Sequence, residues 1–325
     1  ILSKKKINTF EYILDSLVQL QNRGYDSSGI CLIENNEFII HKYASTIETD
    51  CIDKLKNNLS SNNVNISIGH NRWATHGAKN DINAHPHISN NKNIVVVHNG
   101  IIENYKKLKE FLVNKNFKFY SDTDTEVIAN LLEFNYLNNN NFKEVIKKTI
   151  DNLNGTYGLL ILNKAENNRI YCVRNGSPLL LGYNEEYAMI TSEQSGFCNK
   201  LNSYISLQND DICYVELLDN EIKINYNCTY NLKNVNLIDF DETPDPYEHW
   251  TIKEIYEQPQ KIMNSINNGG RILNKKLVKL GGCNDSIDVL KNIDNIILLG
   301  CGTSYHSCMY GKYFMKKLCN FNLIQ

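Results

Sequence analysis

Four residues between positions 70 and 126 could together bind an amino acid and stabilise a developing negative charge. Arg72 ends an apolar run, and its guanidinium offers a planar two-point match to a carboxylate. Asp124 could bind an α-ammonium group, although either Thr123 or Asp124 could instead cap the helix expected there. Asn99 and Gly100 could donate to an oxyanion, although an Asn-Gly pair is also a common turn.

The elements that must position these residues follow from apolar periodicity. Helices are predicted over 8–22, 101–113, 124–136 and 142–152, and strands over 28–33, 37–42, 64–70, 94–97, 157–162, 169–173, 179–181, 188–191, 212–217 and 221–225. The run Ile94–Val97 is apolar without alternation, which is typical of a strand buried on both faces. Two groups of strands with helices between and after them predict a sandwich of two sheets covered by helices.

A second region begins after Asp239–Tyr247, an acidic segment twice interrupted by proline and therefore the best linker candidate. Beyond it we predict a strand over Ile296–Leu299, a turn of small residues and a helix. The turn Gly300–Ser304 could let the backbone and a helix N-terminus approach a phosphate.

Composition restricts the function classes. The 325 residues allow about two domains, and a net charge of −2 with a pI near 6.5 indicates neither a nucleic acid nor an anionic membrane as partner. No apolar run is long enough to span a bilayer. Ten scattered cysteines show no CxxC pair and no zinc spacing, so we expect free thiols in a reducing cytoplasm, with no metal and no cofactor.

Five segments together resemble one family. They are Arg-Gly-Tyr-Asp-Ser-Ser-Gly from residue 23, His-Asn-Arg-Trp-Ala-Thr-His-Gly from residue 70, Asn-Ala-His-Pro-His from residue 83, His-Asn-Gly-Ile-Ile-Glu-Asn from residue 98 and Ser-Asp-Thr-Asp-Thr-Glu-Val from residue 121. In this order they resemble the glutaminase domain of the glutamine–fructose-6-phosphate aminotransferases (isomerizing), over roughly residues 1–235. The segment Ile296–Ser304 resembles the opening of that family's sugar-isomerase domain.

The resemblance implies an α+β chain. Its first part would be an αββα four-layer N-terminal-nucleophile glutaminase domain over 1–235. A linker and entry helix would follow over 236–260, and the first part of an α/β sugar-isomerase (SIS) domain over 261–325. Its partners would be L-glutamine and fructose 6-phosphate, and the full-length enzyme would be a homodimer or a higher homo-oligomer acting in the cytoplasm. No nucleic acid and no membrane are expected.

The resemblance also implies roles for individual residues. The glutamine-binding set would be Arg72, Trp73, Thr75, His76, Asn99, Gly100 and Asp124, with Asn99 and Gly100 as the oxyanion hole. Trp73 and the loop through Asn80 would form a lid. Residues Arg23, Gly24 and Tyr25 would support the nucleophile, and Cys301, Gly302, Thr303 and Ser304 would hold the sugar phosphate. We expect His85 and His87 to be structural.

The family's nucleophile is an N-terminal cysteine in a Cys-Gly-Ile-x-Gly segment, whereas this chain begins at Ile1 and ends at Gln325. We therefore expect a piece of a longer protein, cut at both ends and without glutaminase activity as given. Phosphoribosyl-pyrophosphate amidotransferase and asparagine synthetase share the glutaminase fold, but the quoted motifs favour the sugar branch. The alternative from another class is a non-catalytic glutamine or sugar-phosphate binding protein that has lost its nucleophile.

Overall fold

The chain divides into two compact units, Ile1–Glu242 and Thr243–Gln325, in the computed structural model. The structure describes residues 1–21, 24–58, 63–74, 77–137, 139–235, 246–266, 269–275, 277–278, 286–318 and 323–324. Arg23, Thr75 and His76, together with most of the linker predicted at 239–247, lie outside these described residues.

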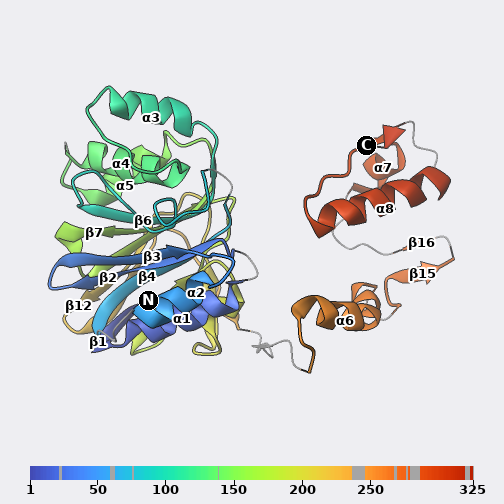
Figure 1. The fold of residues 1–325 in the computed structure, drawn as a ribbon, viewed down its shortest axis with the longest axis horizontal. Helices are drawn as coiled ribbons and strands as arrows, with labels where there is room; N and C mark the ends of the chain where they lie inside the picture. Colours follow the sequence, from blue (N-terminus) through green and yellow to red (C-terminus); the bar gives the residue numbers. More distant parts are fainter. Residues whose placement is uncertain are drawn as a thin grey trace. The chain divides into compact units, whose positions relative to one another are not determined.

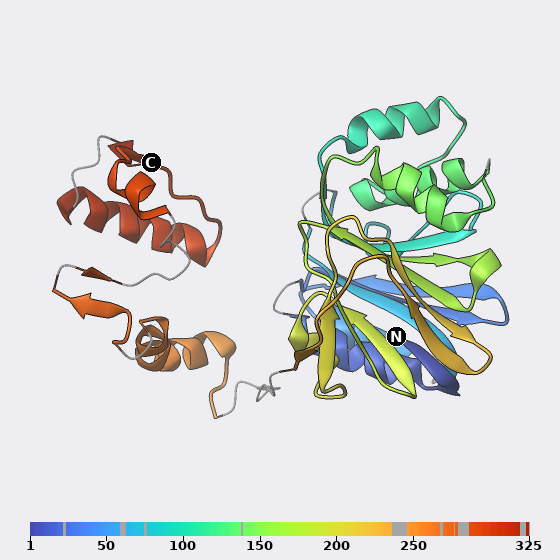
Figure 2. The ribbon, with the colours of Figure 1, turned by 180° about the vertical axis from the view of Figure 1, so that it is seen from behind.

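The first unit is a four-layer sandwich (Figures 1 and 2). One sheet has eight strands in the order β14-β11-β9-β10-β1-β4-β2-β3, and the other has six in the order β13-β12-β8-β7-β6-β5. Helices α1 (Thr9–Gln19) and α2 (Cys51–Asn58) cover the first sheet, and α3 (Tyr105–Val113), α4 (Asp124–Tyr136) and α5 (Phe142–Ile150) cover the second. The αββα arrangement predicted for this part of the chain is therefore observed.

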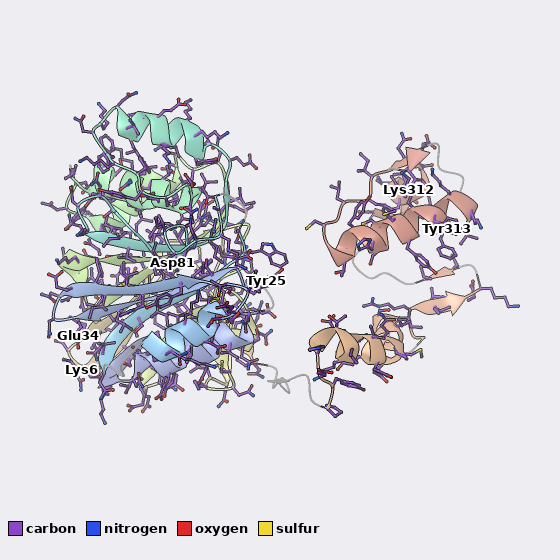
Figure 3. The ribbon with its side chains drawn as sticks, in the orientation of Figure 1. Lys6, Tyr25, Glu34, Asp81, Lys312 and Tyr313 are labelled. Atoms are coloured by element: carbon purple, nitrogen blue, oxygen red, sulfur yellow. The ribbon has the colours of Figure 1, made fainter. Side chains whose placement is uncertain are left out.

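The strands of this unit are β1 Leu2–Ile7, β2 Ser27–Glu34, β3 Glu37–Ala44, β4 Val64–Arg72, β5 His87–Ile88, β6 Ile94–Ile102, β7 Gly155–Asn163, β8 Arg169–Asn175, β9 Leu180–Tyr183, β10 Tyr187–Thr191, β11 Ser203–Ser206, β12 Cys213–Leu218, β13 Glu221–Asn225 and β14 Lys233–Asn234. Two short 3₁₀ helices, Lys164–Glu166 and Gln194–Phe197, connect some of them. Along β2, Tyr25 precedes one end of the strand and Glu34 lies at the other (Figure 3).

Apolar side chains fill all three spaces between the four layers. Strand β6 shows why its sequence is apolar without alternation. Val96 packs in the cluster beneath α4 and α5, whereas Val95 and Val97 pack in the cluster between the two sheets. A third cluster joins α1 and α2 to the eight-stranded sheet. Burial on both sides removes much apolar area from water and so stabilises the layers. The stable layers in turn fix the positions of the strand ends that carry the polar residues described below.

One prediction for the first unit was wrong. The helix predicted over 101–113 begins only at Tyr105, because β6 continues through Ile102. Residues 99–102 pair in antiparallel register with residues 155–158 of β7, and this long-range pairing overrides the helical spacing of the local sequence. The Asn99-Gly100 pair therefore lies within a strand and does not form a turn at its end. Helix α2 was not predicted.

The second unit contains α6 Trp250–Ser265, β15 Ile272–Asn274, β16 Leu277–Val278, α7 Ile287–Lys291, β17 Asn295–Ile296, α8 Thr303–Leu318 and β18 Leu323–Ile324. Of the strand predicted over 296–299, only Ile296 lies in a strand. Among the described residues, its partner β18 pairs with Asn295 and Ile296 alone. Ile297 and Leu299 are exposed. Side chains such as Lys312 and Tyr313 project from α8 (Figure 3). Among the described residues, no helix has the length and apolar character needed to cross a bilayer.

Candidate functional site

A cavity of about 280 Å³ opens in the first unit where β4 of one sheet and β6 of the other approach the start of α4. Its lining is polar. It comprises His70, Asn71, Arg72, Trp73, His85, His98, Asn99, Gly100, Ile101, Asp124, Thr125 and Thr156. Five of the residues predicted to bind an amino acid, namely Arg72, Trp73, Asn99, Gly100 and Asp124, thus line one cavity although up to 52 positions separate them in the sequence.

Arg72 is the buried cation of this cavity. It is the last residue of β4 and only 4% exposed. Burial lowers the pKa of its guanidinium, and the nearby carboxylates of Asp26 and Asp124 oppose that shift, so the side chain stays charged. Its guanidinium nitrogens lie 3.4 and 3.5 Å from the carbonyl oxygens of Ala78 and Gly77, at the outer limit of hydrogen bonding.

Asp124 is the buried anion of the same cavity, and the structure decides between the two capping alternatives. Thr123 is the N-cap of α4, because its hydroxyl accepts from the backbone N–H of Glu126. Asp124 is therefore not needed as the cap. It is 5% exposed, and its Oδ2 accepts from the backbone N–H of Ile102 at 2.8 Å, which fixes the carboxylate at the cavity wall. The α4 N-terminus adds a favourable partial positive charge.

Gly100 shows why this strand position takes glycine. Its φ is +144°, and a Cβ there would lie 2.1 Å from the carbonyl oxygen of Thr156 on the paired strand. Only glycine fits this backbone and this approach. Its neighbour Asn99 is partly buried and lines the cavity with it.

Aromatic rings form the exposed rim beside Arg72. Trp73 and Tyr25 are each about half exposed, and their ring centroids lie 5.6 Å apart. Asp26 ties this rim together, since its Oδ2 accepts from the N–H of Ala74 at 2.9 Å and its Oδ1 lies 3.3 Å from Lys79 Nζ. Gly24 packs against the backbone of Asn71 and Arg72. Tyr25 and Gly24 therefore adjoin the cavity without lining it.

The sequence did not predict a binding role for seven of the lining residues, namely His70, Asn71, His85, His98, Ile101, Thr125 and Thr156. For some of them the local sequence indicated a place near the predicted site residues. His70 and Arg72 are two apart on a strand and so share a face, and His98 directly precedes Asn99. His85, for which only a structural role was predicted, also lines the cavity.

The predicted sugar-phosphate residues lie in the second unit. Thr303 and Ser304 open helix α8, Gly302 has a φ of +60°, and the side chains from Cys301 to Ser304 are exposed.

Buried histidines form a cluster behind the charged pair. The ring of His85 lies 4.3 Å from that of His70 and 4.9 Å from that of His87. Burial lowers the pKa of His85 and of His87 well below the ordinary range, and neighbouring positive groups add to the shift. Burial also lowers the pKa of His98, although Asp124 opposes this. Among the described residues, no group of three or more His, Cys, Asp or Glu is arranged to hold a metal ion.

The first unit is expected to lose stability as the pH falls below about 6.5. The folded state keeps His85, His87 and His98 neutral, whereas the unfolded chain protonates them, so unfolding takes up protons in that range. Each such proton removes about 1.4 kcal/mol per pH unit. The buried α-amine of Ile1, whose pKa burial lowers to about 5, acts in the same direction from about pH 8 downward.

Urea unfolding followed by circular dichroism between pH 8 and 5 measures this slope. The variant His87→Gln should flatten the slope below pH 6.5 and leave it unchanged above. The exposed His249 of the second unit provides the control, because His249→Gln should change neither region of the curve. A stability that stays constant from pH 7 to pH 5 would contradict the expectation.

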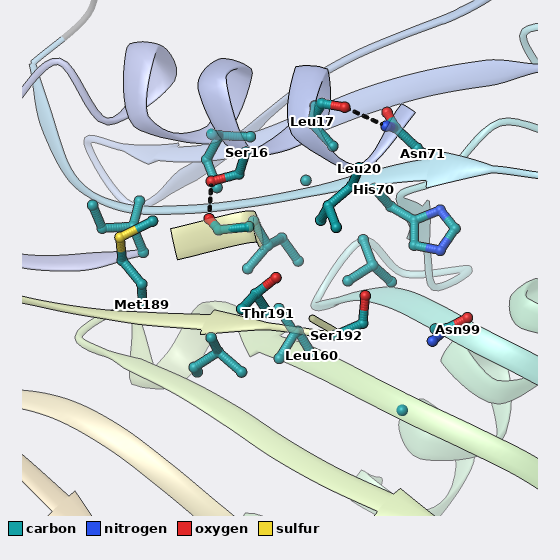
Figure 4. Close-up of a pocket in the computed structure, with 18 of the residues that line it drawn as sticks. Ser16, Leu17, Leu20, His70, Asn71, Asn99, Leu160, Met189, Thr191 and Ser192 are labelled. Atoms are coloured by element: carbon teal, nitrogen blue, oxygen red, sulfur yellow. Dashed lines mark hydrogen bonds between the residues drawn. The ribbon is translucent and has the colours of Figure 1, made fainter. Parts of the chain in front are cut away.

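A second cavity, of about 150 Å³, adjoins the first and is mainly apolar. It extends from Ile1 along residues 68–71 of β4 to Asn99, which lines both cavities (Figure 4). Strand β1 points into it: Leu2 pairs with Ile66, and the Ile1 amine donates to the carbonyl of Ser67 at 2.8 Å. Each step back along β1 advances one residue along β4, so a third residue ahead of Ile1 would fall opposite His70 in this register.

A family model described as a glutamine amidotransferase domain matches residues 70–199, which include every lining residue of the polar cavity. Two solved structures share the fold. They are the glutamine phosphoribosylpyrophosphate amidotransferase from B. subtilis complexed with ADP and GMP (TM-score 0.56, 24% identity, 68% of this chain and 47% of that one) and a structure titled as the allosteric regulatory enzyme of purine biosynthesis (TM-score 0.55, 26% identity, 66% and 46%).

Sequence relatives are more specific. The chain is 37% identical over 311 residues to a probable glutamine–fructose-6-phosphate aminotransferase (isomerizing) of Acanthamoeba polyphaga mimivirus, covering 94% of this chain and 50% of that protein. It is 35% identical to the Clostridium acetobutylicum enzyme of that name (94% and 49%) and 36% identical to that of Thermococcus kodakarensis (95% and 50%). The chain spans about half the length of the curated relatives it matches. It is a homologue of the glutamine–fructose-6-phosphate aminotransferases (isomerizing) and contains their glutamine amidotransferase region.

Proposed function

We propose that this chain is the glutamine-hydrolysing half of an enzyme that makes glucosamine 6-phosphate from fructose 6-phosphate and glutamine. The observation on which this rests is a buried pair of opposite charges, Arg72 and Asp124, facing one small polar cavity. A free α-amino acid carries one carboxylate and one ammonium group, so such a pair selects it and rejects peptides. Asn99 and Gly100, whose amide groups could act as donors, line the same cavity as this charged pair.

In this proposal Arg72 binds the α-carboxylate of glutamine in a two-point contact, and Asp124 binds its α-ammonium through the oxygen not fixed by Ile102. The side-chain amide then reaches Asn99 and Gly100. A thiolate attacks the amide carbon, and the resulting oxyanion accepts from the Asn99 side chain and the Gly100 N–H. Collapse expels ammonia and leaves a thioester, which water hydrolyses to glutamate.

The nucleophile in this proposal is a cysteine three residues ahead of Ile1, whose own α-amine takes up the thiol proton. The register of β1 against β4 supports that position, since the residue would lie opposite His70 in the cavity that ends at Asn99. Trp73 would close over bound glutamine, because it lines the cavity beside Arg72 and about half of its side chain is exposed.

We further propose that Cys301, Gly302, Thr303 and Ser304 hold the phosphate of fructose 6-phosphate. The exposed start of helix α8 supports this, because backbone N–H groups and hydroxyls at a helix N-terminus favour an anion. Acting as a homodimer or higher oligomer, the full-length enzyme would transfer the ammonia released in the first unit to the sugar.

The variant Arg72→Lys is expected to weaken glutamine binding by about 1–3 kcal/mol, roughly 5- to 150-fold, because one contact replaces two charge-assisted ones. Asp124→Asn should weaken it similarly through the ammonium group. Isothermal titration of L-glutamine into the chain and its variants measures both effects, and D-glutamine tests whether the clamp is stereospecific.

Arg169→Lys is the matched control. Arg169 is a partly buried arginine whose Nε donates to Glu216 at 2.7 Å, and it lines neither cavity. Its replacement should leave glutamine affinity unchanged. Equal affinity in a folded Arg72→Lys variant would show that the amino acid binds elsewhere and would overturn the proposed site.

A further inference from the structure

Lys42 on β3 is a largely buried lysine that fastens a loop beneath the polar cavity. Its Nζ donates to three backbone carbonyls, those of Ile82 at 3.0 Å, Ala84 at 2.7 Å and Pro86 at 3.3 Å. An ammonium group has three donors and no acceptor, so these carbonyls satisfy it completely. The lysine therefore binds every second residue of the segment 82–86.

The same loop packs closely against the eight-stranded sheet. A Cβ at Gly29 of β2 would lie 2.2 Å from the carbonyl oxygen of His85 and 2.5 Å from Lys42 Cβ, so glycine alone permits this approach. Asn83 ties the loop to the start of α4, because its Oδ1 accepts from the N–H of Asp122 at 3.0 Å. The loop backbone is thus fixed on three sides.

His85 is the residue that this loop presents to the cavity. It is 5% exposed and lines the cavity together with Arg72 and Asp124. Its Nδ1 is buried and has no hydrogen-bond partner among the described residues. The ring that carries this nitrogen lines the cavity, and a buried polar nitrogen normally has a partner, so a molecule bound in the cavity is the candidate partner.

We infer that Lys42 is a positioning residue of the glutamine site, which holds the 82–86 loop so that His85 Nδ1 meets the bound amino acid. This inference rests on the proposed function, because it takes glutamine as the ligand of the cavity. It adds His85 as a ligand contact and Lys42 as its support, although Lys42 lies outside all of the motif segments.

The charges around Lys42 provide a pH signature. Burial lowers the pKa of Lys42 to about 8; Glu126 of α4 and Asp81 oppose this shift, and Arg72 of β4 adds to it. His87, the other titratable group facing Lys42, is held neutral by burial. Above about pH 8 the neutral amine has two donors for three carbonyls, so the loop loosens and glutamine affinity falls.

Titration calorimetry of L-glutamine with the 325-residue chain tests the inference. Lys42→Met is expected to weaken binding about tenfold at pH 7 and to remove the additional loss of affinity between pH 7 and 9. The α-amine of glutamine titrates equally in both proteins, so the difference between their pH profiles reports Lys42. Lys42→Arg keeps the charge and several donors and should recover part of the affinity.

His85→Ala should weaken binding to a similar extent, and the double variant should be no weaker than either single one, because both changes remove one contact. Additive losses would show that Lys42 acts independently of His85 and would overturn the inference. The pH profile of the unchanged chain and the His85→Ala variant decide the question even if Lys42→Met unfolds.

Lys54→Met is the matched control, since Lys54 Nζ also donates to a backbone carbonyl, that of Ala44 at 2.7 Å, and lines neither cavity. Its glutamine affinity and pH profile should equal those of the unchanged chain. If the unchanged chain binds glutamine and a folded Lys42→Met variant binds it with equal affinity, the role of Lys42 is refuted. Absence of glutamine binding by the unchanged chain refutes the proposed function itself.

Discussion

Extending the chain by Cys-Gly-Ile ahead of Ile1, with a free cysteine amine, is expected to produce glutamine hydrolysis. In the β1–β4 register the cysteine falls opposite His70, in the cavity that ends at Asn99. Its thiol then lies beside the amide donors of Asn99 and Gly100, and its own amine can act as the base. Glutamate release from glutamine, followed with glutamate dehydrogenase, measures the rate.

Two extensions of the same length serve as controls. Ser-Gly-Ile keeps the shape but supplies a much weaker nucleophile, and the rate should fall by more than about 10³-fold. Gly-Cys-Ile moves the thiol by one residue and so turns it to the other face of the strand, which should abolish hydrolysis. Equal rates from all three extensions would show that the thiol is not the nucleophile. Glutamine binding without hydrolysis by the Cys-Gly-Ile form would favour the non-catalytic binding protein.

Gly100→Ala is expected to damage both stability and activity. The new Cβ would lie 2.1 Å from the carbonyl oxygen of Thr156, and alanine is strained at a φ of +144°. The strained backbone alone costs on the order of 1–3 kcal/mol, and β6 and β7 must also move apart to relieve the contact. Urea unfolding measures the loss of stability. Because the shift also misaligns the donors of the oxyanion hole, the Cys-extended form should lose about 10²–10³-fold in rate.

Gly158→Ala is the matched control on the neighbouring strand. Gly158 pairs with Asn99, but a Cβ there would meet its nearest atom, the carbonyl oxygen of Pro178, at 3.4 Å, which is ordinary contact. This variant should unfold within about 1 kcal/mol of the unchanged chain, as substitutions without strain do. Equal stability of the two alanine variants would show that β6 accommodates a side chain at position 100.

Local sequence and the family resemblance together indicated the candidate residues of the cavity. The functional groups of Arg72, Asn99, Gly100 and Asp124 could bind an amino acid and an oxyanion, the resemblance favoured these roles over a turn or a helix cap, and the structure brings all four residues together. The buried strand over 94–97 and the helix near 124–136 were also predicted correctly, because each depends on apolar spacing within a few residues.

Tertiary structure decided what distant residues do to one another. Pairing with β7 extended β6 through Ile102 and placed the Asn99-Gly100 pair, for which a turn was the alternative, within the strand. Ser121 and His87 contact the hydroxyl of Thr123, which caps α4 and leaves Asp124 to the cavity. Lys42 contacts a loop about 40 residues away and supports His85 there. Such contacts join residues far apart in sequence, and apolar periodicity and local residue types contain no information about which of them will meet.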